Sequence, residues 1–475
     1  MGELRRDSRF YKALCWCSIA TRGNPANEEA NVGIAFRLQL EKCKKYADDG
    51  VMKIPESSGQ KKNLAVWIIN TYANLPGEGW RDHRSTLIAN ALAEAGHSTV
   101  WWVSNFEHRS KTFRSPDWKD IQLNPNVLIR VVPSTSYTSH ISLRRIRYEQ
   151  TFARRLYQRA VLCDPPDIIV LSEPALFVSP FVLKLLKHWQ TTLIVDIIDL
   201  WPELFHIALP ARLSKIGRLI FFPFYMRRAA LFRRADAIVA VSSDYLDVAQ
   251  KSYTKNLSEV IYWGVDVSSI QAGMLASDDL PEALRYRAKS PGESWAIYAG
   301  TLGNNYDIRT ILLAAEMLQA QDCPVTILIA GEGPLKREVL ATIESKNLKN
   351  VIYVGNLSAP TVTRLYGFCD IALSTYVSGS TVSMPIKAYD YMAAGLPIVN
   401  SLDRELGSIV VEKNIGMQYT SQDPVSLFHA IQKLAQNPQI RHSMSENAKG
   451  LALSFDARSQ YRKFVKIVEK VARDS

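Results

Sequence analysis

The sequence is poor in cysteine and has no long uninterrupted apolar run. Six cysteines in 475 residues are too few for a disulfide scaffold in a chain of this length, which favours a reducing compartment. The most apolar stretch, residues 167–186, contains Glu173, Pro174, Pro180 and Lys184, whereas a membrane-spanning helix needs ~20 consecutive apolar residues. We therefore predict no transmembrane segment.

Targeting signals and metal-binding patterns are also missing. The short apolar run at 13–20 follows the acidic Glu3 and Asp7, which is unlike a signal peptide, so we expect the protein in the cytoplasm. Cys15 and Cys17 are the only closely spaced cysteines, and no histidine lies near them in the sequence. A zinc site is therefore not expected.

Positive charge is in excess, with a formal net charge of +11. Such an excess indicates an anionic partner, which the charge alone leaves open between nucleic acid, anionic lipid and a phosphorylated substrate. Residues 212–234 contain seven Lys or Arg and no acid, and residues 143–160 contain six Arg and the single acid Glu149. Both segments fit either a basic amphipathic helix on an anionic membrane or a core-facing helix with a solvated basic face.

The chain divides into five segments by its hydrophobic pattern. Residues 1–63 show no clear alternation and are treated as an N-terminal extension. Short β-branched runs then alternate with helical stretches over 64–265 and again over 295–455, which is typical of βα units around a parallel sheet. Residues 266–294 are polar and are predicted as a linker, and residues 456–475 as a last helix. We predict an α/β protein of two doubly wound domains.

Two glycine loops in the second domain follow predicted strands. Gly300 and Gly303 lie between a strand and a helix, and Gly331 and Gly333 repeat this arrangement. Backbone amides at a helix start can bind an anion, although glycine turns are common in βα units of any function. Neither loop matches GxGxxG or GxxxxGKS, which excludes the dinucleotide-fold fingerprint and the P-loop.

A third motif, residues 384–397, places two opposite charges on one predicted helix. Lys387 and Asp390 are three residues apart and therefore share a face. A cation for phosphate and a carboxylate for sugar hydroxyls suit a sugar nucleotide, whereas an ordinary surface ion pair would look the same in sequence.

These segments, taken in order, resemble family 4 of the retaining glycosyltransferases. That family has the GT-B fold, in which two Rossmann-like domains face each other across a cleft and a C-terminal helix crosses back. The matching motifs are PGEGW at 76–80, DLWPE at 199–203, ADAIVAVS at 235–242, WGVD at 263–266, YAGTLG at 298–303, IAGEGPL at 329–335, VGNLS at 354–358, CDIALS at 369–374 and PIKAYDYMAAGLPIV at 385–399. The resemblance covers about residues 64–455 and is greatest to enzymes of bacterial surface-polysaccharide assembly, such as those of O-antigen and capsule.

The resemblance implies that the C-terminal domain binds a nucleotide-activated sugar. The 300–303 loop would hold the diphosphate, Lys387 would stabilise the departing diphosphate, and Asp390 would bind the ribose hydroxyls. Such charge stabilisation is usually the largest catalytic contribution. The implied donor-binding residues are Gly300, Thr301, Leu302, Gly303, Asn304, Gly331, Glu332, Gly333, Asn356, Ser380, Thr381, Lys387 and Asp390.

The N-terminal domain would present the acceptor. The implied acceptor-binding residues are Gly77, Glu78, Gly79, Trp80 and Arg84. By their strand-end positions, Glu173, Asp199 and His108 join Lys387 as catalytic candidates, although a single acid or histidine in a loop is more often structural.

The sequence departs from the family pattern at three places. The family has two glutamates eight residues apart, whereas here the second is Asp390 and Val382 stands at the first. The segment 378–381 (SGST) could supply hydroxyls and backbone amides instead. An Arg and a Lys are common in the first phosphate loop, where this chain has Thr301 and Asn304 or Asn305. The usual histidine after the fourth strand is absent, and Glu173 stands there.

The resemblance implies sugar transfer with retention of the anomeric configuration. The donor would be a nucleoside-diphosphate sugar, with UDP favoured over GDP, and the acceptor a saccharide or polyprenyl-linked saccharide in surface-polysaccharide biosynthesis. No strand-end DxD pair is present, so we expect metal independence and no cofactor besides the donor. A peripheral enzyme on the inner face of an anionic membrane is expected from the basic helices.

Two alternatives stay open: a sugar-nucleotide epimerase of the same fold, and a non-catalytic anion- or nucleic-acid-binding protein. A nucleic-acid partner is disfavoured because the donor motifs are largely intact.

Overall fold

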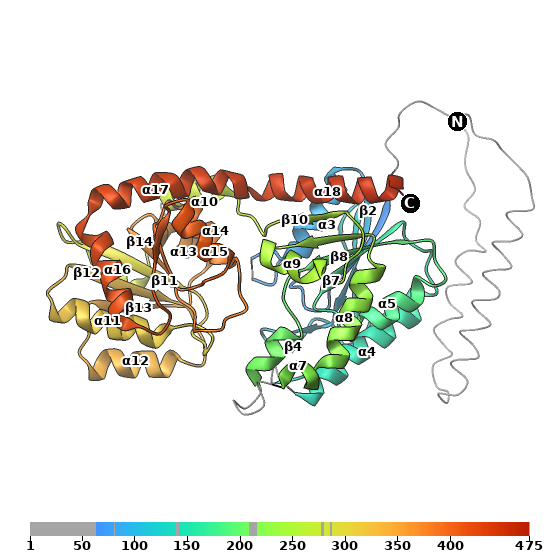
Figure 1. The fold of residues 1–475 in the computed structure, drawn as a ribbon, viewed down its shortest axis with the longest axis horizontal. Helices are drawn as coiled ribbons and strands as arrows, with labels where there is room; N and C mark the ends of the chain where they lie inside the picture. Colours follow the sequence, from blue (N-terminus) through green and yellow to red (C-terminus); the bar gives the residue numbers. More distant parts are fainter. Residues whose placement is uncertain are drawn as a thin grey trace, which may run out of the picture.

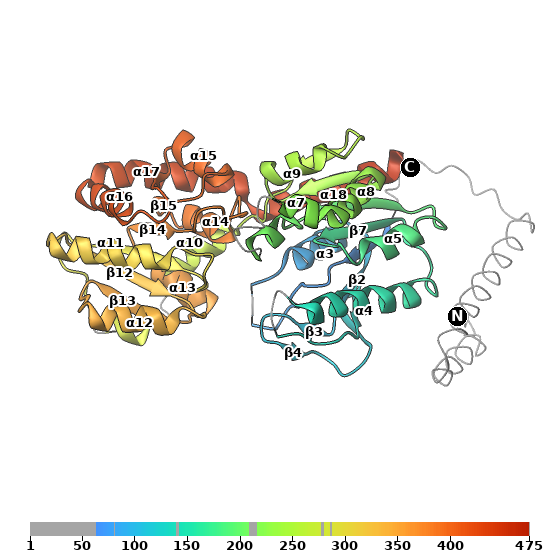
Figure 2. The same ribbon diagram turned by 60° about the horizontal axis from the view of Figure 1, so that its bottom comes forward.

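The computed structural model describes residues 63–79, 81–138, 142–208, 216–276, 280–285 and 287–474. The predicted extension, residues 1–63, lies outside the described residues apart from Asn63. The described chain forms two α/β domains side by side, with the helices α17 (Pro438–Ala452) and α18 (Ala457–Asp474) running along one edge of both (Figures 1 and 2). The predicted pair of doubly wound domains with a C-terminal helix that crosses back is confirmed.

The N-terminal domain is built on an eight-stranded sheet. Its strands lie in the order β10-β9-β8-β7-β1-β2-β6-β5, and all neighbours pair in parallel except β5 and β6. Their bounds are β1 (Ala65–Ile69), β2 (Ser98–Ser104), β5 (Lys119–Asn124), β6 (Val127–Val132), β7 (Ile168–Glu173), β8 (Thr192–Ile197), β9 (Ala237–Ala240) and β10 (Ser258–Val260), with a separate hairpin of β3 (Phe106–Glu107) and β4 (Thr112–Phe113). The central strands β7, β8 and β9 are runs of buried, mostly β-branched residues, as expected for parallel strands covered on both faces.

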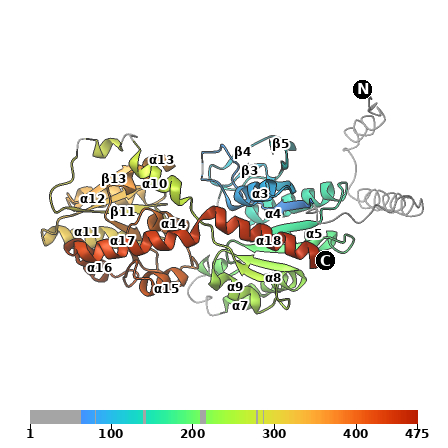
Figure 3. The same ribbon diagram turned by 90° about the horizontal axis from the view of Figure 1, so that it is seen from above.

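Successive side chains of each strand point to opposite faces of the sheet, so the N-terminal domain has a hydrophobic core on each face. Val66 and Ile68 face helix α3 (Arg84–Glu94) and α18, whereas Trp67 and Ile69 face the opposite side. That opposite side is covered by α4 (Leu143–Ala160), α5 (Ser179–Leu185), α8 (Phe222–Arg234) and α9 (Ser243–Gln250). The C-terminal helix therefore completes the core of the first domain (Figure 3).

The C-terminal domain has a six-stranded parallel sheet in the order β13-β12-β11-β14-β15-β16. The strands are β11 (Ser294–Ala299), β12 (Val325–Ala330), β13 (Val351–Gly355), β14 (Ile371–Ser374), β15 (Ile398–Asn400) and β16 (Gly416–Gln418). One face is covered by α11 (Ile308–Ala320), α12 (Lys336–Ser345) and α16 (Pro424–Gln436), the other by α13 (Ala359–Tyr366), α14 (Ile386–Ala393), α15 (Glu405–Glu412) and α17.

The chain crosses between the domains twice, at two segments that run side by side. Val265 forms a parallel bridge with Asp456, and its backbone bonds to Phe455 and Ala457 at 3.0 and 2.9 Å. Gly264 has a φ of +71°, and a Cβ there would lie 2.7 Å from the Cα of Ala457. The close approach of the two crossings therefore requires glycine at 264.

Two further findings concern segments singled out in the sequence. Residues 266–294, predicted as a linker, contain α10 (Val267–Leu275) and the short helix η2 (Glu282–Leu284), and α10 packs on α13. Among the residues that the structure describes, no helix combines the length and the apolar character needed to span a bilayer.

Candidate functional site

The carboxyl ends of both sheets meet at the boundary between the domains. Tyr245, in the first turns of α9 after β9, donates a hydrogen bond of 3.2 Å to the backbone oxygen of Thr381, in the loop after β14. The amide of Ser243 donates to a carboxylate oxygen of Glu405 at 2.8 Å, and Ser383 donates to Asp244. In open α/β sheets this edge is where ligands bind, so the candidate site lies here.

The predicted donor residues follow neighbouring strands on this edge. Asn356 comes after β13, Gly331 after β12, Gly300 after β11, and the 378–381 loop after β14, which are adjacent strands of the sheet. Helix α14, with Lys387 and Asp390, lies on the side of the C-terminal domain that faces the N-terminal domain (Figures 2 and 3). The structure thus brings the predicted donor set together, and the roles of its members stay predictions.

The two glycine loops pack backbone against backbone. A Cβ at Gly331 would lie 1.8 Å from the backbone oxygen of Gly300, and a Cβ at Gly333 would lie 2.3 Å from that of Leu302. Both glycines also have positive φ values, of +143° and +155°. Glycine at 331 and 333 is therefore required by the contact between the loops themselves.

This packing corrects two expectations for the first loop. The amides of Gly300 and Leu302 already donate to the backbone oxygens of Ala330 and Glu332, each at 2.9 Å. The Leu302 side chain is fully buried in the domain core, so it is a packing residue and does not reach a ligand. The exposed residues at this loop are Thr301, Asn304 and Asn305.

Lys387 has an unusual environment. Its ammonium lies 4.2 Å from the ring centre of Tyr298 and 5.1 Å from those of Tyr306 and Tyr376. The nitrogen is buried and has no hydrogen-bond partner among the described residues, and a Cβ built on Gly300 would lie 3.4 Å from it. Burial lowers its pKa from 10.5 to about 7. Three aromatic faces attract the cation, but no carboxylate of the described residues pairs with it, so the site is suited to an incoming anion.

Asp390 does not pair with Lys387, contrary to the surface ion pair that the sequence left open. It pairs instead with Arg81 of the N-terminal domain, whose Nη1 lies 2.7 and 2.8 Å from the two carboxylate oxygens. Arg81 was missed in the sequence, because its partner lies 309 residues away in the chain.

The remaining donor candidates lie at the surface of this edge. Glu332 is bound by Lys336 and by the Tyr353 hydroxyl, and Asn356 is exposed beyond β13. Thr381 is held by Tyr245, and the backbone oxygen of Ser380 accepts a 3.2 Å bond from Arg404. The 378–381 loop is thus fixed on the N-terminal domain side of the donor edge.

In the N-terminal domain an aromatic and acidic cluster occupies the strand ends. The Arg145 guanidinium stacks on Trp201 and Tyr72 at 4.3 and 4.8 Å, and the Tyr72 hydroxyl donates to Glu149. Burial raises the pKa of Glu149 to about 7, even though Tyr72 and Arg145 act in the opposite direction. The sequence analysis did not predict this cluster. The feature that could have indicated it is Glu149, the single acid in a basic helix, with Arg145 one turn before it.

The three catalytic candidates of this domain lie beside that cluster. Glu173 is 1% exposed; one carboxylate oxygen accepts a 3.0 Å bond from the Ala175 amide, and the other is buried with no partner among the described residues. Burial raises the pKa of Glu173 to about 7 and also raises that of Asp199. His108 stacks edge-on against Tyr72 at 5.8 Å, and burial lowers its pKa to about 4, so it is neutral near pH 7.

In the predicted acceptor loop, two glycines form the turn and Glu78 holds the loop in place. Gly77 and Gly79 have positive φ values of +84° and +79° and open space around them. Glu78 is bound by Arg114 at 2.6 and 2.8 Å and by the Leu75 amide at 2.8 Å, so its carboxylate fixes the loop. Trp80 lies outside the described residues.

Arg84 is not an acceptor-contact residue. Its side chain is fully buried and pairs with Asp196 at 2.9 and 3.0 Å, and it also donates to the backbone oxygens of Ile261 and Tyr262. Arg84 therefore connects α3 to β8 and to the segment that first crosses between the domains, at residues 261 and 262. The prediction fails because an arginine at a helix start looks the same in sequence whether it points outward or inward.

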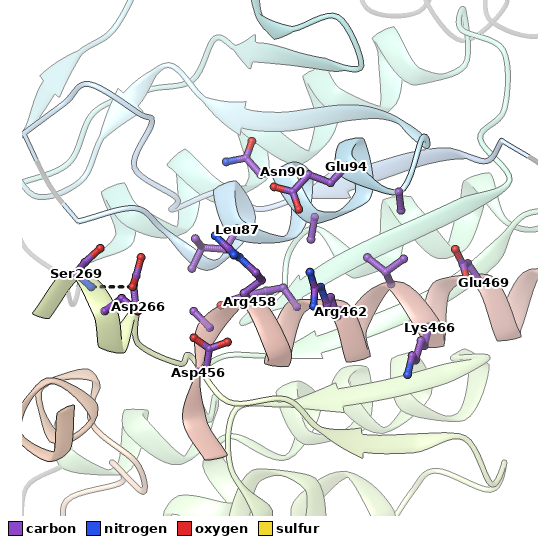
Figure 4. A pocket seen from close by; sticks show the side chains of 16 residues that line it. Leu87, Asn90, Glu94, Asp266, Ser269, Asp456, Arg458, Arg462, Lys466 and Glu469 are labelled. Carbon is purple, nitrogen blue, oxygen red and sulfur yellow. Dashed lines mark hydrogen bonds between the residues drawn. The ribbon is translucent and has the colours of Figure 1, made fainter. Parts of the chain in front are cut away.

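A separate cavity of about 740 Å³ lies at the domain crossings, away from these strand ends. It lies between α3, the start of α10 and α18, and Arg458 and Arg462 point from α18 toward the Asn90 and Glu94 side (Figure 4). Among the described residues no group of three or more His, Cys, Asp or Glu could hold a metal ion.

Comparisons with known proteins agree with this architecture. The family model described as "Glycosyltransferase Family 4" matches residues 86–269, and the model described as "Glycosyl transferases group 1" matches residues 282–451. Two yeast chitobiosyldiphosphodolichol beta-mannosyltransferases are similar over short stretches: that of Debaryomyces hansenii is 26% identical over 96 residues and that of Yarrowia lipolytica 33% over 92. These stretches are 20% and 19% of this chain, and the chain spans about a fifth of the length of each relative.

Solved structures match over most of the chain at low identity. Sucrose-phosphate synthase from Thermosynechococcus elongatus has a TM-score of 0.64 at 16% identity, covering 87% of this chain and 100% of its own. An E. coli trehalose-6-phosphate structure bound with UDP-2-fluoro glucose has a TM-score of 0.63 at 13% identity, covering 85% and 99%. Anabaena HepE in complex with UDP has a TM-score of 0.60 at 14% identity, covering 86% and 100%. These likenesses show the fold.

Proposed function

We propose that this chain, which belongs to the family 4 glycosyltransferases and has the GT-B fold, transfers a sugar from a nucleoside-diphosphate sugar to a saccharide or lipid-linked saccharide acceptor. The observation that carries the proposal is the Lys387 ammonium, buried among three tyrosine rings beside Gly300 with no anion near it in the described structure. A diphosphate would supply the missing negative charge.

In this proposal each residue of the donor edge contacts a different part of the donor. Lys387 stabilises the charge that develops on the diphosphate as it leaves, in a buried position where such an interaction is strong. UDP is the first nucleotide to test, because two neighbours of the same fold were solved with UDP or a UDP-sugar. Asp390 and the exposed 356 region would contact the ribose and base.

We propose that the reaction retains the anomeric configuration. The bond from the anomeric carbon to the diphosphate oxygen breaks, and the bond to the acceptor oxygen forms on the same face. The acceptor proton passes to the departing phosphate oxygen. In this proposal Glu173, which has one carboxylate oxygen without a partner among the described residues, would hold the acceptor hydroxyl.

The acceptor is proposed to be linked to a lipid, as in surface-polysaccharide assembly. The curated relatives are named for a diphosphodolichol-linked acceptor. Support from this chain is the exposure of two apolar side chains, Leu219 on α7 (Gly217–Ile220) at 75% and Phe222 at the start of α8 at 55%, on helices that also carry the exposed Arg218 and Arg227. Apolar and basic side chains together bind anionic membranes, at ~1 kcal/mol per basic residue near the surface.

The transfer proposal is tested by product analysis. Purified protein is incubated with UDP- and GDP-sugars and a short polyprenyl-diphosphate saccharide, and the extended lipid and released diphosphate are quantified. Diphosphate released only with acceptor supports transfer. An isomerised sugar nucleotide formed without acceptor would establish the epimerase instead.

The membrane proposal is tested by vesicle flotation. Wild type should float with vesicles containing anionic lipid and not with neutral ones, and the paired change Leu219→Ser and Phe222→Ser should weaken flotation about tenfold. Leu340→Ser, a 40% exposed leucine on the donor domain, is the matched control and should float as wild type. Equal flotation of all variants, or none by wild type, contradicts membrane docking through this face.

A further inference from the structure

An ion pair connects the two domains next to their crossing segments. Arg81 Nη1 lies 2.7 Å from one oxygen of Asp390 and 2.8 Å from the other, and Arg81 Nη2 donates to the backbone oxygen of Gly264 at 3.3 Å. The Arg81 side chain is 42% exposed and that of Asp390 is 17% exposed. The guanidinium therefore covers a carboxylate that has little other access to solvent.

Arg81 extends from a loop whose base is fixed. Its own backbone oxygen accepts a 2.9 Å bond from the Asn74 side chain, and Glu78 is clamped by Arg114. This loop, which the structure describes over 74–79 and 81–83, contains the predicted acceptor residues Gly77, Glu78 and Gly79. The side chain of Arg81 thus reaches from the acceptor loop into the donor edge.

Asp390 is the carboxylate that the family resemblance assigns to the donor ribose. It lies one turn after Lys387 on α14, so both groups belong to the same edge of the sheet. A carboxylate that binds two ribose hydroxyls must present both oxygens to them, and here both oxygens face one guanidinium nitrogen.

We propose that Arg81 holds Asp390 in the nucleotide-free protein and that the donor ribose displaces it. The inference rests on the proposed function. Donor binding then breaks an interdomain ion pair and releases the Arg81 side chain from the donor edge. Arg81 thereby lowers donor affinity and links occupation of the donor site to the acceptor loop, which favours binding of the donor before the acceptor.

The test measures UDP and GDP dissociation constants by calorimetry on the full chain. Arg81→Gln removes the competing cation, so the nucleotide that binds should do so about fivefold more tightly, which corresponds to ~1 kcal/mol. Arg81→Lys, which keeps the charge without the planar guanidinium, should give a smaller gain. Arg309→Gln is the matched control, because Arg309 makes a two-nitrogen pair with Glu338 inside the donor domain; it should bind as wild type.

A double-mutant comparison separates competition from a general change in the protein. Asp390→Asn should weaken binding, and adding Arg81→Gln to Asp390→Asn should give no further gain. Equal or weaker binding by Arg81→Gln, or a gain that persists without the Asp390 carboxylate, overturns the inference. Failure of the proposed function has a different signature, since wild type and all variants would then bind neither nucleotide.

Discussion

The two strand-end clusters differ in how their buried charge is balanced. On the donor side, Lys387 is a single ammonium surrounded by tyrosine rings, with no anion among the described residues. On the acceptor side, Glu149 and Glu173 are buried near Arg145 and Arg228, which offset part of their charge. The donor edge lacks a charge that the substrate would bring, whereas the acceptor edge is already close to balanced.

Burial acts on both clusters with opposite sign. It lowers the pKa of Lys387 to about 7 and raises those of Glu149 and Glu173 to about 7, because a buried site disfavours the charged form of either group. This difference supports the proposal that the first edge binds an anionic donor and the second binds neutral acceptor hydroxyl groups. Four experiments test it.

The largest effect is expected from Lys387→Met, which keeps an apolar chain among the tyrosines and removes the charge. If the ammonium stabilises the leaving diphosphate as proposed, kcat/KM for transfer should fall about 10²- to 10³-fold. Steady-state transfer assays measure it. Lys346→Met is the control, because Lys346 is exposed and paired with Glu316, which is outside the predicted donor set; a transfer rate of Lys387→Met within about threefold of this control would contradict the assignment.

The thermal stability of Lys387→Met tests whether Lys387 carries a buried charge that costs stability in the folded protein. Lys387 has a pKa of about 7 in the folded protein against 10.5 ordinarily, so the unfolded chain binds more protons between these values. The cost of the buried charge is fully present below pH 7 and is relieved as pH rises toward 10.5. The advantage in Tm of Lys387→Met over wild type should therefore shrink from pH 7 to pH 10. A constant difference would mean that charge is not the cause.

A smaller effect is expected from Glu173→Gln on the acceptor side. It keeps the shape and removes the titrating carboxyl, so kcat should fall about 10- to 100-fold, whereas the donor dissociation constant should stay as in wild type. Glu259→Gln, on an exposed edge-strand residue, is the control. If donor affinity changes instead of kcat, Glu173 belongs to the donor site and the comparison between the two edges is wrong.

The smallest effect is a shift of the alkaline limb of the pH profile. Donor capture needs protonated Lys387, so kcat/KM should fall as pH rises through about 7 in the free enzyme. Tyr306→Leu removes one ring from the cation, which should move that limb about 0.5 unit lower, and Tyr306→Phe should leave it in place. A uniform loss of activity without a shift would assign Tyr306 a structural role only.

Local patterns in the sequence predict much of this architecture. Runs of β-branched residues predict the central strands, and the glycine loops with Lys387 predict which edge of the second sheet carries the donor site. Strand β5 was missed because its alternation is short: only Ile121 and Leu123 are apolar, and both are only partly buried against the core. Helix α10, within the predicted linker, fully buries only Val267, with Ile270 and Met274 partly buried, and so gives a weak amphipathic pattern.

Contacts between distant residues account for the rest. Arg84 was expected at the acceptor and instead pairs with Asp196, 112 residues away, and Asp390 is held by Arg81 from the other domain. Leu302 was expected at the ligand because it lies in the 300–303 loop that the resemblance assigns to the diphosphate, yet it packs in the core. The local sequence does not predict the ion-pair partner of a charged side chain, because the packing of distant segments determines it.

Proton uptake on nucleotide binding tests the central claim most directly. Calorimetric titration of UDP and GDP at pH 8, in buffers of different ionisation enthalpy, counts the protons taken up by the complex. A diphosphate beside Lys387 should raise its pKa again, so wild type should take up nearly one proton with the nucleotide that binds, and Lys387→Met should bind weakly with none. Tight binding without proton uptake, unchanged in Lys387→Met, would contradict the account.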